Sequence, residues 1–329
     1  MSRLIRLPGS DSNDNQMSPL MKAIKSIHAV SSSGDSILLE DIKKQRAAQD
    51  LFGGLNTPSK SIETESVKIK NIPAEWVRPN YKHEKRRIIM YCHGGGYCCG
   101  SLKYARVLAS KLALNTGMEV MSFEYRLAPE NPYPAALKDA ITVWNYIMQL
   151  GYGAREVVLV GDSAGGNLAL ELALHLKSQK RMLPKGIVLM SPWTDMTMIG
   201  ESYKTCKDAD PVLTKEYIQT ARFSFVGLNK KFNEDIKDFK IDDSTFNYAD
   251  PKFSPLFADF ANFPPFLIQV GSNEILKSDA YNLYEKLIKD SVTVTLEEYE
   301  DAWHVFQMMP FKKALRAMDS ISKFIEELY

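Results

Sequence analysis

Short apolar runs recur along the chain from about residue 65 onward, separated by segments in which apolar residues return every three to four positions. Continuous apolar runs of this length are typical of strands that are buried on both faces, and the three-to-four spacing is typical of amphipathic helices. The alternation predicts an α/β protein with a mostly parallel sheet covered by helices on both faces. The runs are RIIMYCHGGG, GMEVMSFEYR, EVVLVGDSAGG, GIVLMSPW and PFLIQVGSNE.

Three helices are expected within this alternation, starting after Pro134, spanning about Gly165–Lys180, and spanning about Phe311–Glu327. The segment SVTVTLEEY differs from the other strands because apolar and polar residues alternate along it, as in a half-exposed strand. We expect this strand at the edge of the sheet. The unpaired backbone groups of an edge strand can pair with the same strand of a second copy of the chain, so a homodimer through this edge is a hypothesis.

Two regions lie outside the alternation. Residues 1–16 are polar and are expected to form a loose leader, followed by helices over about Pro19–Val30 and Ile37–Asp50. Between Met198 and Ala258 the alternation stops, and the charged run NKKFNEDIKDFKIDD is typical of a solvated surface. Both regions are candidates for a lid. The expected organisation is N-terminal cap helices over 1–55, a first core segment over 56–197, a cap insertion over 198–258 and a second core segment over 259–329.

Composition narrows the classes of partner. The 329 residues include 41 basic and 40 acidic side chains, so the charge gives no reason to expect nucleic acid or an anionic membrane as partner. No apolar window reaches the length of a membrane span, and the first twenty residues lack the apolar centre of a secretion signal. We therefore expect a cytoplasmic protein that does not associate with membranes.

The four cysteines lack the paired spacing of metal sites and favour a reducing compartment. Adjacent Cys98 and Cys99 are interpreted as small packing residues, with a redox role as the alternative.

One serine stands at a strand-to-helix junction, in VVLVGDSAGGNLALELAL. Gly161 and Gly165 bracket Ser163, which is either part of a turn that ends a strand or a nucleophile raised on a strained elbow. The Ala/Leu-rich helix that follows would direct its N-terminal N–H groups at developing negative charge. The context favours the nucleophile.

A serine hydroxyl needs a base, and five histidines are available. His304 follows the last strand, at the sheet edge where Ser163 is expected, and is the candidate base. His175 lies too far along the helix after Ser163, and His28 and His83 are expected in solvated or packing roles. His93 is interpreted as a support for its loop.

The base in turn needs an acid, to fix its tautomer and stabilise the imidazolium. Glu274 stands just past the end of the strand PFLIQVG and is preferred. Asp279 is the rival, although an acid in the first turn of a helix is often a capping residue. Asp301 is too near His304 in sequence and ranks last.

An oxyanion hole is predicted at YCHGGGYCCG, because the successive glycines Gly94, Gly95 and Gly96 let backbone N–H groups approach a carbonyl oxygen. A flexible loop is the alternative. Ala164, directly after the serine, would supply a further donor.

Five ordered motifs over residues 85–329 resemble the bacterial hormone-sensitive-lipase-like esterases: HGGGYCCGS, EYRLAPENPYPAALKDA, GDSAGGNLAL, FPPFLIQVGSNEILKSDA and AWHVFQ. The resemblance implies an α/β-hydrolase fold with a helical cap built from N-terminal helices and an insertion before the acid. Many members carry aspartate where this chain has Glu274, and the charged insertion near 229–246 is longer than usual. By resemblance, the nucleophile is Ser163, the acid Glu274, the base His304, and the oxyanion donors are Gly95, Gly96 and Ala164.

The leading hypothesis is a carboxylesterase that cleaves short- to medium-chain acyl esters of small molecules through an acyl-enzyme, with no metal and no organic cofactor. An amidase or formamidase with the same triad is the first alternative. A small-molecule receptor on the same fold is the second, and the presence of His304 disfavours it.

Overall fold

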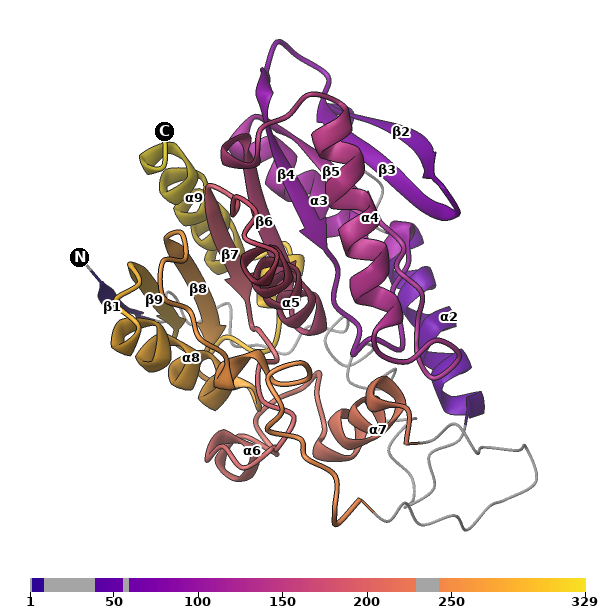
Figure 1. Ribbon diagram of the computed structural model, residues 1–329, viewed down its shortest axis with the longest axis vertical. Helices are drawn as coiled ribbons and strands as arrows, with labels where there is room; N and C mark the ends of the chain where they lie inside the picture. Colours follow the sequence, from indigo (N-terminus) through magenta and orange to yellow (C-terminus); the bar gives the residue numbers. More distant parts are fainter. Residues whose placement is uncertain (1, 9–38, 56–58, 229–242) are drawn as a thin grey trace.

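A single sheet organises the molecule. The computed structural model describes residues 2–8, 39–55, 59–228 and 243–329 (Figure 1). In that part of the chain, nine strands form one sheet in the order β1-β9-β8-β7-β6-β4-β5-β3-β2. The strands are β1 (Arg3–Leu7), β2 (Ile62–Ile69), β3 (Ile72–Pro79), β4 (Glu84–Cys92), β5 (Met118–Phe123), β6 (Val157–Asp162), β7 (Gly186–Met190), β8 (Phe266–Gly271) and β9 (Val294–Tyr299).

Neighbouring strands are parallel except where β3 pairs with β2 and with β5. Helices cover both faces, with α4, α5 and α8 on one and α3 and α9 on the other (Figure 1). The predicted α/β class and its mostly parallel sheet are confirmed. These helices are α3 (Leu102–Thr116), α4 (Ala135–Gln149), α5 (Ala164–Ser178), α8 (Lys277–Lys289) and α9 (Lys312–Glu327).

The core consists of two apolar layers, because successive residues of a strand point to opposite faces. In β4, Ile88 and Met90 pack in the layer beneath α4 and α5, while Ile89 and Tyr91 pack in the layer beneath α3 and α9. This burial on both faces explains why the central strands are apolar at every position.

Helix α3 was not among the expected elements, although it carries clear end signals. Ser101 Oγ accepts a hydrogen bond from Tyr104 N (3.3 Å), and Gly117 ends the helix at φ 64°. The helices expected after Pro134, over 165–180 and over 311–327 correspond to α4, α5 and α9.

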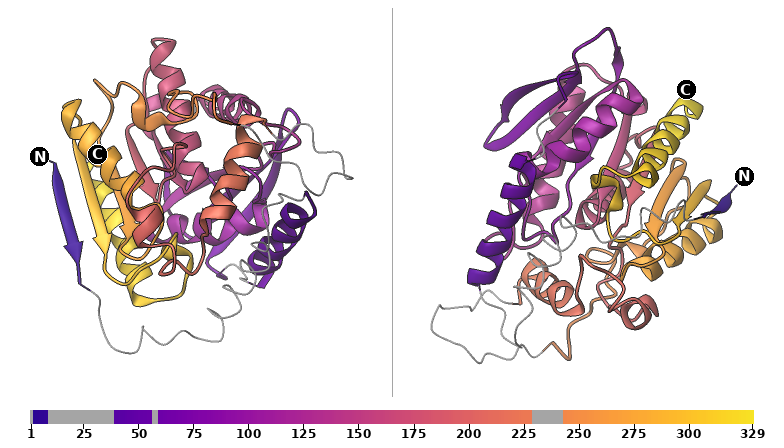
Figure 2. Two further views of the ribbon diagram at one scale, coloured as in Figure 1. Left: turned by 90° about the horizontal axis from the view of Figure 1, so that it is seen from below. Right: turned by 180° about the vertical axis from the view of Figure 1, so that it is seen from behind.

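Two expectations about the ends of the sheet are wrong. Arg3–Leu7 is not part of a loose leader, since it forms β1 and pairs in parallel with β9. The strand over 291–299 is therefore not at the edge, because β1 lies outside it (Figure 2). The alternating pattern reflects a strand near the edge, with polar side chains on one face. The dimer stays a prediction, without the edge that motivated it.

The remaining α-helices lie near the carboxyl ends of the parallel strands (Figures 1 and 2). Helix α2 (Leu39–Leu55) packs against α3, while α6 (Ser202–Thr205) and α7 (Lys215–Val226) lie below the sheet (Figures 1 and 2). The helix expected over 19–30 and most of the charged run, residues 229–242, fall outside the described residues. In the described part of the chain, no helix has the length and apolarity needed to cross a membrane.

Candidate active site

Ser163 sits on a strained turn between β6 and α5. Its backbone has φ 53° and ψ −122°, a conformation that costs a non-glycine residue about 1–3 kcal/mol. The turn is also too tight for side chains beside it: a Cβ at Gly161 would lie 2.2 Å from Gly165 O, and one at Gly165 would lie 2.1 Å from Cys92 O. The glycines thus allow the turn that raises the hydroxyl out of the sheet.

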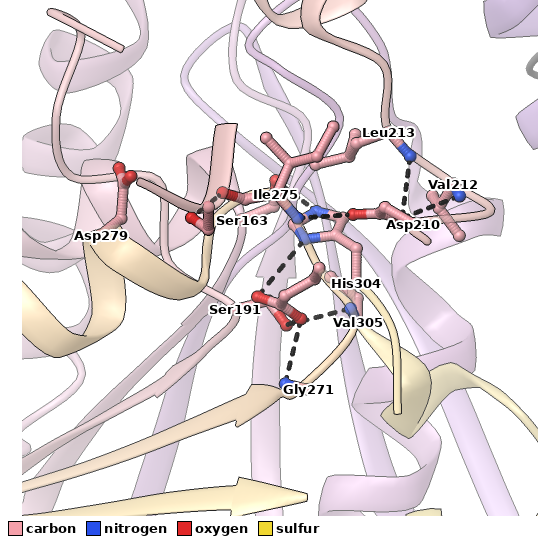
Figure 3. A network of polar contacts seen from close by, with 12 residues as sticks. Ser163, Ser191, Asp210, Val212, Leu213, Gly271, Ile275, Asp279, His304 and Val305 are labelled. Carbon is pink, nitrogen blue, oxygen red and sulfur yellow. Dashed lines mark hydrogen bonds and ion pairs between the residues drawn. The ribbon is translucent and has the colours of Figure 1, made fainter. Parts of the chain in front are cut away.

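His304 meets this hydroxyl from the loop after β9. Its Nε2 lies 2.9 Å from Ser163 Oγ, and both side chains are largely buried (Figure 3). The two residues are 141 positions apart in sequence. The predicted convergence of serine and histidine at one edge of the sheet is therefore present in the structure.

Glu274 lies on the other side of the imidazole and is completely buried. Its Oε1 is 3.9 Å from His304 Nδ1, which is an ion-pair contact but longer than a hydrogen bond. Its Oε2 accepts hydrogen bonds from Ser191 Oγ (2.8 Å) and Gly271 N (3.1 Å). In the described part of the chain neither Oε1 nor Nδ1 has a hydrogen-bond partner, so a small approach would join them.

The rival acids serve other contacts. Asp279, in the first turn of α8, accepts hydrogen bonds from the N–H groups of Thr194 (2.8 Å) and Asp195 (2.9 Å). In Figure 3 its carboxyl group lies apart from the imidazole. Asp301 is exposed, on the turn after β9. Of the three candidate acids, the structure brings only Glu274 to His304.

The electrostatic surroundings favour a charged imidazole. Burial of the ring lowers the pKa of His304, but the adjacent Glu274 carboxylate outweighs it, assisted by Asp210 and Asp162, so that the pKa is raised above 6.5. An imidazolium formed by taking the Ser163 proton is thereby stabilised.

The loop over Gly94–Gly96, which we call the glycine loop, lies beside Ser163, because Gly95 and Gly96 line the same pocket. Gly95 and Gly96 have φ values of 110° and 61°, in the region that favours glycine. The Gly95 carbonyl accepts hydrogen bonds from the N–H groups of Cys98 and Cys99, which closes the loop into a tight turn. Ala164 is the first residue of α5. Of the three predicted oxyanion residues, Gly95 and Gly96 thus line the same pocket as Ser163, and Ala164 follows the serine directly in the chain.

His93 contacts the backbone of this loop. It is buried, stacks on Tyr125 at 4.2 Å between ring centroids, and its Nδ1 lies 2.7 Å from Gly94 O. Burial lowers its pKa to about 4, so the ring is neutral near pH 7. His83 contacts Glu119 and His175 lies along α5, whereas His28 is outside the described residues.

Three further residues hold the site, and the sequence analysis did not single them out. Asp162 accepts hydrogen bonds from Tyr91 OH (2.6 Å) and Gly94 N (2.9 Å), tying the elbow to the glycine loop. Ser191 also accepts a bond from Val305 N (3.0 Å) and so joins the acid to the histidine loop. Lys111 Nζ donates to the carbonyls of Gln307 and Met309. Only Asp162, directly before the serine, stands in a motif that signals its position.

A small cavity opens at Ser163, and we call it the Ser163 pocket. Its volume is ≈ 80 Å³, and its walls come from α2, the glycine loop, the segment before α7 and the loop after His304. The walls are mainly apolar. The lining residues include Gln49, Phe52, Val212, Leu213, Met308 and Met309.

The cysteines are consistent with the packing interpretation. All four are free and buried. Burial raises the pKa of Cys98 to about 12, which disfavours a reactive thiolate. Within the described ranges, no group of three or more His, Cys, Asp or Glu side chains is arranged to hold a metal ion.

Known proteins match this chain over most of its length. It matches the alpha/beta hydrolase fold family over residues 89–308. It is 33% identical over 270 residues to an esterase of Acinetobacter venetianus, covering 82% of this chain and 83% of the relative. It is 34% identical over 260 residues to an acetyl-hydrolase of Streptomyces hygroscopicus, covering 79% of each. A solved esterase of the bacterial hormone-sensitive lipase family is similar, with a TM-score of 0.80 and 29% identity over 94% of this chain and 98% of that one.

Proposed function

Because the chain belongs to the α/β-hydrolase family, among the esterases of the bacterial hormone-sensitive lipase type, and is a carboxylic ester hydrolase, we propose that it cleaves short- to medium-chain acyl esters through an acyl-enzyme on Ser163. The observation that carries this proposal is the 2.9 Å contact between Ser163 Oγ and His304 Nε2, with Glu274 behind the imidazole.

The proposed reaction begins with attack of Ser163 Oγ on the ester carbonyl carbon while His304 Nε2 takes the hydroxyl proton. The carbonyl oxygen becomes an oxyanion, which accepts hydrogen bonds from the N–H groups of Gly95, Gly96 and Ala164. The carbon–oxygen bond to the alcohol then breaks, and His304 gives its proton to the leaving oxygen. Glu274 stabilises the imidazolium throughout.

Water completes the cycle. His304 takes a proton from the water that attacks the acyl-enzyme, and a second tetrahedral intermediate forms. In its collapse the bond to Ser163 Oγ breaks, His304 gives that oxygen the proton it took from water, and the carboxylic acid is released. The imidazole thus takes one proton and gives one proton in each half of the cycle.

The size of the Ser163 pocket supports a short acyl group. Its volume of ≈ 80 Å³ is small beside the roughly 300–1,000 Å³ of pockets that take drug-sized ligands. Apolar walls formed by Phe52, Met308 and Met309 suit a hydrocarbon chain. We therefore expect the rate to decline as the acyl chain becomes longer.

The cap of this enzyme is proposed to comprise helices within residues 1–55 and the insertion 198–258. Support comes from the pocket walls, since Gln49 and Phe52 belong to the first region and Val212 and Leu213 to the second. Strand β1 is the exception within the first region, because it belongs to the sheet. A cytoplasmic location and a homodimer stay predictions.

The Ser163→Ala variant tests the proposal. It should lose the burst and steady-state release of p-nitrophenol from p-nitrophenyl butyrate, while Ser178→Ala, at the exposed end of the same helix, keeps both. A panel of esters from acetate to laurate measures the acyl preference. Matched aryl esters and anilides decide between the esterase and the amidase alternative. Undiminished turnover by Ser163→Ala would refute the mechanism.

A further inference from the structure

Asp210 is a buried carboxylate at the point where the chain leaves α6 for the wall of the Ser163 pocket. Its side chain is 6% exposed, and its backbone N–H donates to Cys206 O at 3.0 Å. Ser202, at the start of α6, exchanges hydrogen bonds with Ser278 on α8. The segment up to Asp210 is thus anchored to the core.

The Asp210 carboxylate accepts three backbone hydrogen bonds in two directions (Figure 3). Oδ1 accepts from the N–H groups of Val212 (2.9 Å) and Leu213 (3.1 Å). Oδ2 accepts from Ile275 N (3.0 Å), in the loop that carries the acid. Charged acceptors of this kind form the stronger protein hydrogen bonds.

These three partners belong to two functional parts of the site. Val212 and Leu213 line the Ser163 pocket, so they shape the space offered to substrate. Ile275 directly follows Glu274, whose carboxylate lies at the imidazole. One side chain therefore joins the pocket wall to the catalytic acid.

Asp210 also has an electrostatic effect on His304. Burial raises its pKa to about 6, an effect that the His304 charge and the N–H groups of Ile275 and Val212 oppose, and that Glu274 reinforces. Above that pH it carries a negative charge near His304, whose other charged neighbours are Glu274 and Asp162. Three carboxylates thus raise the pKa of the imidazole.

We propose that Asp210 is a positioning residue of the hydrolytic reaction. Its carboxylate holds the Val212–Leu213 wall of the Ser163 pocket against the loop that carries Glu274. Its negative charge also stabilises the His304 imidazolium. The proposal rests on the function proposed above, and it goes beyond the three residues of the triad. It predicts that one substitution changes both substrate binding and the pH dependence of catalysis.

Asp210→Asn tests both effects. The amide oxygen can keep the bonds from Val212 and Leu213, but the amide NH₂ then faces Ile275 N–H, so a bond and the charge are lost together. We expect KM for p-nitrophenyl butyrate to rise several-fold. The acid limb of kcat/KM should move to lower pH by about half a unit or more, because removal of a nearby negative charge lowers the pKa of His304. Asp208→Asn, an exposed neighbour, is the charge-matched control and should change neither.

Asp210→Glu separates the two effects and replaces Asp210→Asn if that variant does not fold. It keeps the charge but displaces the carboxylate, so KM should rise while the acid limb stays at its wild-type position. A purely structural role predicts lower thermal stability in both variants with KM and the acid limb unchanged, and that result overturns the proposal. A change in only one of the two properties in Asp210→Asn also overturns it. The loss of turnover in Ser163→Ala reports on the proposed function independently.

Discussion

Replacing Glu274 by glutamine tests the acid with little change in shape. The amide oxygen can accept the bonds that Ser191 Oγ and Gly271 N now donate to Oε2. The amide NH₂ then occupies the Oε1 position, 3.9 Å from His304 Nδ1, and donates toward it. This arrangement keeps the imidazole proton on Nε2, toward Ser163, where the ring can no longer accept the hydroxyl proton.

The expected loss is large. In serine–histidine–acid triads, change of the acid to its amide lowers kcat by about 10⁴ because the imidazole adopts the wrong tautomer. That factor corresponds to about 5 kcal/mol of transition-state stabilisation. Glu274 is completely buried and no solvent charge replaces it, so we expect a loss of about 10³- to 10⁴-fold.

Steady-state hydrolysis of p-nitrophenyl butyrate at pH 8 measures this loss, with circular dichroism to show that the variant folds. Asp279→Asn is the matched control. Its amide oxygen can retain both bonds that Oδ2 accepts, from Thr194 N and Asp195 N, so kcat should stay near the wild-type value. If Glu274→Gln keeps more than a tenth of the wild-type kcat while the kcat of Asp279→Asn falls below a tenth, the assignment of the acid is wrong.

Further predictions concern pH, stability and thiols. The acid limb of kcat/KM should have its midpoint above 6.5, because burial lowers the pKa of His304 but Glu274, Asp210 and Asp162 together raise it by more; a midpoint below 6.5 in a pH–rate profile contradicts this. The carboxyl group of Glu171 is buried, and neither oxygen has a hydrogen-bond partner in the described chain, so burial raises its pKa well above 4.5. Stability should therefore fall as pH rises above 4.5, which is the pKa of this glutamate in the unfolded chain. The Glu171→Met variant should have a free energy of urea unfolding that is higher than wild type by about 1–3 kcal/mol at pH 8, and by less at pH 4.5. If Glu171→Met is less stable than wild type at both pH values, the Glu171 carboxyl group has a stabilising partner and this reasoning is wrong. Because burial raises the pKa of Cys98 to about 12, iodoacetamide at pH 8 should leave the activity of the native enzyme unchanged, and rapid inactivation contradicts the packing role.

Much of the fold is predictable from sequence because the central strands are buried on both faces. Such strands must be apolar at every position, and the helices between them must carry one apolar side, so both leave a readable pattern. Arg3–Leu7 leaves no such pattern, since an edge strand is short, charged and largely exposed. Its pairing with β9 depends on backbone hydrogen bonds, which any residue except proline can make.

The residues of the site likewise include some that a local sequence pattern reveals and some that it does not. Ser163 and the glycine loop are recognisable because steric limits at tight turns leave glycine as the residue that fits. Ser191 and Asp210 were not recognised, because neither stands in a local motif that marks its contact with the acid loop around Glu274. Ser191 contacts Glu274 across 83 positions, and Asp210 contacts Ile275 across 65. Ser163 and His304 are 141 positions apart and were still paired, because the serine stands in a recognisable motif, whereas Ser191 and Asp210 stand in none.

Peptide mapping after treatment with diethyl p-nitrophenyl phosphate tests the central claim most directly, since this reagent phosphorylates an activated serine hydroxyl. Mass spectrometry should find one diethyl phosphoryl group per chain, on the peptide that contains Ser163, in step with the loss of esterase activity. The His304→Ala variant should be labelled far more slowly. Stoichiometric labelling at another residue, with Ser163 unmodified in the inactivated enzyme, would contradict the proposed nucleophile.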